Sequence, residues 1–222
     1  MGNVAQYSPA KERVLDEAER LFMQNGYRSV TLRDVADALG IRQASLYYHF
    51  PAGKEELFVA MAERVFQRHR TGIEAAVERA PGDLASRLMA VADWLGSQPP
   101  VNFLAMVHSD VSALDPERAH RVSTAAYDAL FTPLRRIFDD AQARGETRPI
   151  HSDMVSGFFI SLMDGISVSV GQQQRFKRRE LAQEAVRLIM QGVARNEAHD
   201  GEMDEGAPAE LEHQSGDKNY GR

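Results

Sequence analysis

Residues 31–50 read TLRDVADALGIRQASLYYHF, and this stretch decides the fold. Thr31 can cap a helix, with Asp34 three residues later as a shortened capping box, and Gly40 ends that helix after about two turns. A third short segment, residues 42–50, follows almost at once, so the chain must turn sharply and the two helices must cross steeply. The pattern predicts the two crossed helices of a helix-turn-helix unit.

A first helix precedes this stretch. Ser8 supplies a capping hydroxyl before Pro9, and Gly26 stands where a helix end needs a residue with positive φ. Between them, apolar residues recur with the helical period at Val14, Leu15, Ala18, Leu21 and Phe22. We therefore expect three short helices within residues 8–53.

Longer helical segments follow, and strand signals are nearly absent. The expected ranges are Lys54 to about Ala80, a helix capped by Asp83 that ends before Gly96, Asn102 to Leu114, Asp115 to Gly145 with a kink or break at Pro133, Ser152 to about Gly171, and Arg178 to Arg195. The predicted fold is all-α, with a three-helix N-terminal domain at 8–53 and a six-helix C-terminal bundle at 54–195.

The last segment, residues 196–222, has a different composition. It holds eight acidic and two basic residues, which accounts for the formal net charge of −6, and it is almost bare of large apolar side chains. Such a segment cannot bury enough apolar surface to offset the conformational entropy that it would lose on folding. We expect an acidic disordered tail that keeps the chain soluble, with an autoinhibitory arm that competes with DNA as the sharper alternative.

Composition also excludes several classes of protein. The chain has no cysteine, which excludes disulfide scaffolds, thiolate zinc sites and cysteine nucleophiles. No apolar run is long enough to span a bilayer, and the start lacks the regions of a signal peptide. We expect a cytoplasmic protein that binds no membrane and carries no cofactor and no metal.

The third short helix carries the polar side chains that point to function. Ile41, Leu46 and Phe50 are expected to face the core. The other side presents Arg42, Gln43, Ser45, Tyr47, Tyr48 and His49, with Lys54 just beyond. Gln and Arg can read base edges, and Tyr, Ser, His and Lys can bind phosphate oxygens. The simpler alternative is a tyrosine-rich helix packed against the larger domain.

The N-terminal segment resembles the tetracycline-repressor (TetR) family. The resemblance rests on residues 31–41, on Leu46-Tyr47-Tyr48-His49-Phe50, and on Lys54-Glu55-Glu56-Leu57. It implies an all-helical homodimer whose first three helices bind double-stranded DNA and whose C-terminal bundle binds a small-molecule effector. It further implies Gln43 and Ala44 at bases, Thr31, Tyr47, His49 and Lys54 at phosphates, and Arg33 and Tyr48 at or near the DNA.

The turn before the fourth helix departs from the commonest pattern of this family. Pro51-Ala52-Gly53 places three residues between Phe50 and Lys54, where two are usual. The reach of Lys54 toward a phosphate is therefore open.

The expected helix that starts at Ser152 is too apolar for one core face. Large apolar residues cover much of the segment that starts at Ser152, and a stripe of small residues recurs every four positions at Gly157, Ser161, Gly165 and Ser169. Together with Leu181, Ala185, Leu188 and Ile189, this favours a homodimer interface through the last two helices. Packing of the stripe within one monomer is the alternative.

An effector pocket is predicted from aromatic and methionine residues with a few polar groups. Its candidate walls are Trp94, Phe103, Met106, Val107, His108, Tyr127, Phe131 and Phe159, which favour an apolar or aromatic effector. His108 with Asp110 could instead orient a polar ligand or a metal. Arg175, Lys177, Arg178 and Arg179 form a basic cluster that is either a solvated loop or an anion site.

Catalysis has little support in the sequence. There is no phosphate-binding glycine loop, no paired histidines on one helix turn and no nucleophile elbow. We predict no catalytic residue and a ligand-responsive DNA-binding regulator, most simply a repressor. An all-helical enzyme and a helical adaptor without DNA binding are the alternatives.

Overall fold

The computed structural model of the chain describes residues 7–99, 103, 106–169 and 177–194. All regular elements there are helical apart from one isolated bridge between Thr147 and Ala194, which confirms the all-α prediction. Within these residues, no helix combines the length and apolar character that crossing a membrane would require. The predicted tail at 196–222 and Arg175 of the predicted basic cluster lie outside the described residues.

The N-terminal unit consists of α1 (Pro9–Asn25), α2 (Leu32–Leu39) and α3 (Gln43–His49), close to the predicted bounds. The Ser8 hydroxyl accepts a hydrogen bond from the Lys11 amide at 3.3 Å, as expected of a cap. Gly40 ends α2 in the left-handed conformation at φ 65°, which favours glycine. These local signals explain why the three helix boundaries were predictable.

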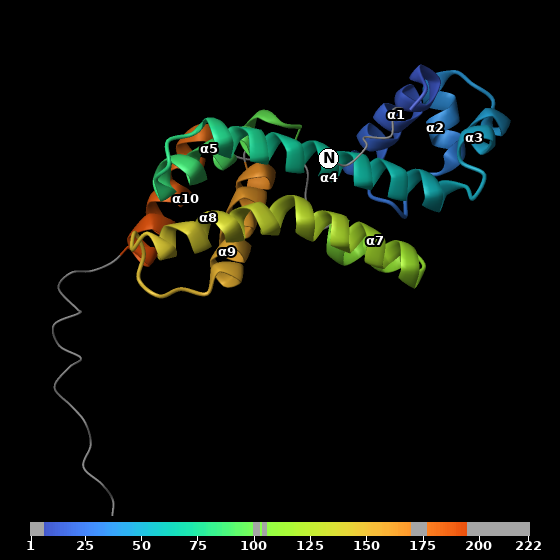
Figure 1. Cartoon of the computed structure of the whole chain (residues 1–222). Coiled ribbons are helices and arrows are strands. Elements are labelled where there is room, and N and C mark those ends of the chain that lie inside the picture. Colours follow the sequence, from blue (N-terminus) through green and yellow to red (C-terminus); the bar gives the residue numbers. More distant parts are fainter. Residues whose placement is uncertain (1–6, 100–102, 104–105, 170–176, 195–222) are drawn as a thin grey trace, which may run out of the picture.

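The remaining helices form a larger bundle, part of which runs back beside the N-terminal unit (Figure 1). They are α4 (Lys54–Arg79), α5 (Leu84–Ser97), α7 (Pro116–Ala126), α8 (Thr132–Ala143), α9 (Ser152–Ser169) and α10 (Arg178–Val193). Asp83 and Asp115 cap α5 and α7 by accepting backbone N–H bonds, as predicted. At about 1.5 Å per residue, the 26 residues of α4 span roughly 39 Å.

The helix expected from Asn102 to Leu114 is α-helical at Phe103 but is not a regular α-helix from Met106 onward. Met106–Asp110 forms a π turn and Val111–Ala113 forms a 3₁₀ turn. The Asp110 carboxylate accepts a hydrogen bond at 3.0 Å from the backbone N–H of Tyr27 in the N-terminal unit. This tertiary contact, together with the Asp115 cap that starts α7, constrains the segment more strongly than its helical propensity does.

The long helix expected from Asp115 to Gly145 is interrupted directly before Pro133, close to the predicted kink or break. The π turn Tyr127–Phe131 separates α7 from α8, and the Thr132 N–H donates to the Tyr127 carbonyl five residues earlier. Proline lacks an N–H and its ring collides with the carbonyl four residues before it. A wider turn directly ahead of Pro133 relieves that collision while the helix continues.

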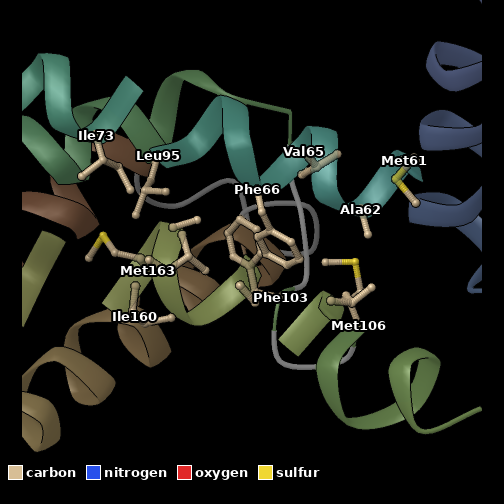
Figure 2. Packing of buried hydrophobic residues seen from close by; sticks show 14 of the residues in the cluster. Met61, Ala62, Val65, Phe66, Ile73, Leu95, Phe103, Met106, Ile160 and Met163 are labelled. Carbon is tan, nitrogen blue, oxygen red and sulfur yellow. The ribbon is translucent and has the colours of Figure 1, made fainter. Parts of the chain in front are cut away.

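α4 contributes to the hydrophobic packing of both parts of the molecule. Near its start, Phe58 packs edge-on against Phe22 of α1, with ring centroids 5.3 Å apart. Further along, Phe66 and Ile73 are buried in the bundle, where Phe66 lies against Phe103 with 6.0 Å between ring centroids (Figure 2). One helix therefore connects the two parts through a continuous buried face.

Gly72 lies where α4 and α5 meet most closely. A Cβ atom on Gly72 would come within 2.0–2.5 Å of the Trp94 indole ring. Real Cβ atoms do not approach other atoms so closely, and an aromatic ring cannot bend away as a flexible chain end can. Glycine is therefore required here by packing, although its φ is unremarkable.

We expect Gly72→Ala to lower the free energy of unfolding by about 1–3 kcal/mol, because overpacking outweighs the gain of up to about 1 kcal/mol in helix propensity. Gly192→Ala in α10 is the matched control, since its Cβ would meet nothing within 4 Å. Urea unfolding of both variants measures the difference. A Gly72→Ala protein as stable as the wild type would contradict the close approach of Trp94.

His69 is the most buried titratable side chain of α4, with 1% of its surface exposed. In the described part of the chain neither ring nitrogen has a hydrogen-bond partner. Burial, reinforced by the nearby charge of Arg68, lowers the pKa of His69 from 6.5 to about 4. The folded protein therefore holds this imidazole neutral where the unfolded chain would protonate it.

This pKa predicts acid sensitivity. Between pH 6.5 and 4 the unfolded chain binds more protons at this site, so stability is lost as pH falls, by up to about 1.4 kcal/mol per pH unit. His69→Phe should flatten that slope in urea unfolding measured from pH 7.5 to 5. The exposed His151, changed to Gln, controls for the loss of one histidine. Equal slopes in wild type and His69→Phe would refute the assignment.

Candidate nucleic-acid interface

Two buried side chains hold α3 in place, and most of its other side chains are exposed to solvent. Leu46 and Phe50 are fully buried among residues of α1, α2 and α4. Because both core residues lie on one side of this seven-residue helix, the opposite side must face outward. The sequence predicted this division for both residues.

The outward side carries the predicted polar and aromatic residues. Tyr48 is 84% exposed and Tyr47 is 47% exposed. Arg42, Gln43, Ala44 and Ser45 are also exposed, whereas His49 is half-buried with its ring 5.2 Å from that of Tyr48. Exposed tyrosines at this density are rare unless a partner covers them, and these side chains include the hydrogen-bonding types that bind bases and phosphates.

Ile41 corrects one expectation. The sequence assigned it to the core face, but it is 37% exposed at the turn between α2 and α3. The reason is local: the N–H of Ile41 donates to the Ala36 carbonyl at 3.0 Å, which closes the end of α2 and directs the side chain outward.

Thr31 and Arg33 are exposed, and both already have partners. The Thr31 hydroxyl donates to the Asp34 carboxylate at 2.7 Å, and the Asp34 N–H donates back to the hydroxyl at 3.2 Å. These hydrogen bonds hold the pKa of Asp34 below its usual value. Arg33 is exposed and lies 3.6 Å from Asp37. Thr31 therefore serves as the cap of α2 in this structure.

The Lys54 side chain, which the sequence placed at a phosphate, points toward the N-terminal unit instead of away from it. Its Nζ lies 3.4 Å from the Arg28 carbonyl, to which it donates, and 4.2 Å from the centre of the Tyr27 ring. Partial burial lowers the pKa of Lys54 from its ordinary value. The turn before it is fixed by Gly53, whose φ of 82° favours glycine.

A network of ion pairs joins α1 to α4. The Arg64 guanidinium lies 2.7 Å from Glu12 and 2.8 Å from Asp16, and Arg68 lies 2.6 Å from Glu19. Glu19 is only 14% exposed and also lies 3.2 Å from Arg64. Such shared, partly buried pairs are stronger than isolated surface pairs. They fasten the orientation of α1 to that of α4.

The bundle reaches the N-terminal unit at two further points. Asp110 accepts the Tyr27 N–H, and partial burial raises the pKa of this carboxyl group. Glu55, in the first turn of α4, accepts the Asp115 N–H at 2.6 Å and pairs with Arg118 at 3.0 Å. Movement of the segment before α7 would therefore shift Tyr27 and the first turn of α4, which lie next to α2 and α3.

The predicted effector residues differ in burial and position. Phe103, Met106 and Phe159 are buried, and Trp94, Val107 and Phe131 are half-buried. Tyr127 is exposed, stacks on Phe131 at 5.4 Å and donates its hydroxyl hydrogen to Asp153. His108 belongs to the π turn Met106–Asp110. Phe103 alone among the eight lines the small cavity beside His69.

The sequence missed the polar wall of that cavity, which consists of His69, Asp164 and Arg178. His69 could have been found, because it shares the buried face of α4 with Ala62, Phe66 and Ile73 at helical spacing. Arg178 was assigned to a solvated basic loop or an anion site. It is half-buried instead and donates to the Gly96 carbonyl at 3.2 Å, while Arg179 pairs with Asp93.

Within the described ranges, the other pockets are open grooves on the surface. No group of three or more His, Asp or Glu side chains there is placed to hold a metal ion. An open polar groove of about 450 Å³ runs between α4 and α7, with the Glu63–Arg121 ion pair in its wall. None of the predicted effector residues lines it.

Comparison with known proteins agrees with the geometry. The family model described as "Bacterial regulatory proteins, tetR family" matches residues 14–61. The chain is 36% identical over 80 residues to the HTH-type transcriptional regulator LmrA of Bacillus subtilis, a match that covers 34% of this chain and 43% of LmrA. It is 28% identical over 167 residues to the HTH-type transcriptional repressor ComR of Escherichia coli, covering 72% of this chain and 78% of ComR.

A solved structure extends the likeness beyond the N-terminal unit. The TetR family transcriptional regulator PfmR from Thermus thermophilus superposes with a TM-score of 0.66 at 25% identity, covering 82% of this chain and 100% of that chain. Its match includes the bundle as well as α1–α3. With its capped α2, glycine turn and outward-facing α3, the N-terminal unit matches the TetR family of bacterial regulatory proteins, and the chain shares the fold of a TetR family regulator.

Proposed function

We propose that the protein is a transcriptional repressor that binds a two-fold symmetric operator as a homodimer and is released by a small-molecule effector. The observation that carries this proposal is the outward side of α3, with its exposed Gln43, Tyr47 and Tyr48 on a rigidly packed helix. A helix presented in this way fits the major groove of B-DNA.

Roles within the surface follow from side-chain chemistry. Gln43, at the start of α3, can hydrogen-bond an adenine edge bidentately, with Ala44 beside it at a thymine methyl. Tyr47, Tyr48 and His49 are suited to phosphates, and Arg42 and Arg33 add positive charge at the rim. Lys54 is the least direct of the proposed contacts, since its ammonium already rests on Tyr27 and the Arg28 carbonyl.

A gel-shift experiment with DNA from upstream of the gene tests the proposal, and two variants sharpen it. Gln43→Ala should cost about 1–3 kcal/mol at particular base pairs and relax the preference there. Tyr47→Phe, which removes only a hydroxyl, should weaken binding to all operator variants alike. Uniform weakening by Gln43→Ala would exclude a base contact, and absence of sequence-specific binding by the wild type would exclude the proposed function.

An exposed apolar face supports dimerisation through α9 and α10. Met154, Phe158 and Leu162 follow at intervals of four residues on α9 and are 57%, 59% and 40% exposed. Leu188 of α10 is 56% exposed. Gly165 leaves open space around its Cα, so another backbone could approach closely. A second copy of this chain would bury these side chains and set the spacing of its two α3 helices.

Phe158→Glu should convert the dimer into a monomer, because the interface would have to bury a charge. Analytical ultracentrifugation measures the mass, and affinity for a two-fold operator should fall with it. Gln67→Glu adds the same charge at an exposed position of α4 and serves as the control. A Phe158→Glu protein that remains dimeric would place the interface elsewhere.

α4 is suited to couple the bundle to α3, the helix proposed to contact the bases. Its first turn carries Lys54 and Glu55 beside α3, and its far end is buried in the bundle. A tilt of α4 would change the separation of two α3 helices, which must match major grooves about 34 Å apart. The effector then needs only a difference in affinity between the two states, typically worth about 1–3 kcal/mol.

A further inference from the structure

The small cavity beside His69 has the features of a closed recognition site. It lies where α4, α5, α9 and the start of α10 converge, and Figure 2 labels four of its lining residues, Leu95, Phe103, Ile160 and Met163. Its volume of about 10 Å³ suffices for about one water molecule. Its walls are mainly apolar, formed by Phe103, Ile160 and Met163, with three polar side chains from different helices.

Two of these polar side chains carry opposite charges and are already engaged. Asp164 is 5% exposed and accepts the Phe103 N–H at 2.8 Å. Arg178 donates to the carbonyls of Gly96 at 3.2 Å and Gln98 at 3.4 Å. The wall therefore carries no net charge, and neither a cation nor an anion is favoured by it.

The third polar side chain is His69, and it is the one with unused hydrogen-bonding capacity. It is 1% exposed and neither ring nitrogen has a hydrogen-bond partner among the described residues. Burial lowers its pKa to about 4, so at neutral pH one nitrogen donates and the other accepts. A hydroxyl group, which can both donate and accept, is the complementary partner.

We propose that His69 anchors the effector, and that the effector is an uncharged, mainly apolar small molecule with one hydroxyl group, such as a phenol or an alcohol. This inference rests on the proposed function, since it names the ligand class of the same regulator. It places the site at His69, Phe103 and Met163 rather than at the exposed Tyr127.

The ligand's apolar body requires the neighbouring side chains to move. The Phe103 ring packs edge-on against His69, with ring centroids 5.0 Å apart, and a ligand ring could take over that position. Met163, being unbranched, can adapt its shape around the ligand. The structure is therefore that of the protein with the site closed.

Phenol is the probe, added to the full-length protein labelled with ¹⁵N-histidine at pH 7. The ring-nitrogen signal of His69, assigned by its absence in His69→Phe, should shift and saturate with a Kd at or below about 1 mM. Benzene, which has the ring without the hydroxyl, should bind at least tenfold more weakly to the wild type. His69→Phe should lose at least tenfold in phenol affinity.

Several results would overturn the inference. They are no saturable shift at His69, equal affinity for benzene and phenol, or tighter binding of benzoate or tetramethylammonium than of phenol. The benzene comparison uses the wild type, so it stands even if His69→Phe does not fold.

A gel shift run alongside separates this inference from the proposed function. Phenol should weaken operator binding by the wild type at least fivefold. It should not change the operator affinity of His69→Phe. If a saturating concentration of phenol leaves the operator affinity of the wild type unchanged, the site is not an effector site. Absence of operator binding refutes the repressor function, while the NMR titration still decides whether His69 binds a hydroxyl compound.

Discussion

The rest of the structure depends on the fact that α4 is buried at both ends by different partners. Leu57, Phe58 and Met61 belong to the packing of the N-terminal unit, and Phe66 and Ile73 belong to that of the bundle. Both sets lie on one rigid helix, so neither part can reorient without the other responding. The Arg64 and Arg68 ion pairs to α1 reinforce this linkage with directional contacts.

Much of the fold was predictable because its signals are local. The Ser8, Thr31, Asp83 and Asp115 caps and the glycines at 26 and 40 lie where helices start and end. Residues 106–113 were mispredicted as α-helix because a contact distant in sequence, Asp110 with Tyr27, constrains their conformation. Ile41 was misassigned because the turn geometry, rather than hydrophobicity, sets its direction.

The candidate DNA surface was easier to predict than the effector site. α3 is so short that burying Leu46 and Phe50 forces its remaining side chains outward. The cavity beside His69 joins residues up to 109 positions apart, from His69 to Arg178, and no local pattern reports their convergence. Aromatic composition alone selected Tyr127, which turned out to be exposed, and overlooked a buried histidine in the helical period of α4.

The π turn between α7 and α8 has a consequence for the tolerance of the chain to changes in length. Val122, Ala126, Leu130, Leu134 and Phe138 are all buried at a constant interval of four residues. In an unbroken α-helix, residues at that interval drift by about 40° each time, or about 160° over the four intervals. One extra residue taken up by the wide turn offsets about 100° of that rotation and keeps all five on one side. A deletion of one residue within Tyr127–Phe131 would restore ordinary helical winding and bring the Pro133 ring against the carbonyl four residues before it, so the chain needs the extra residue here.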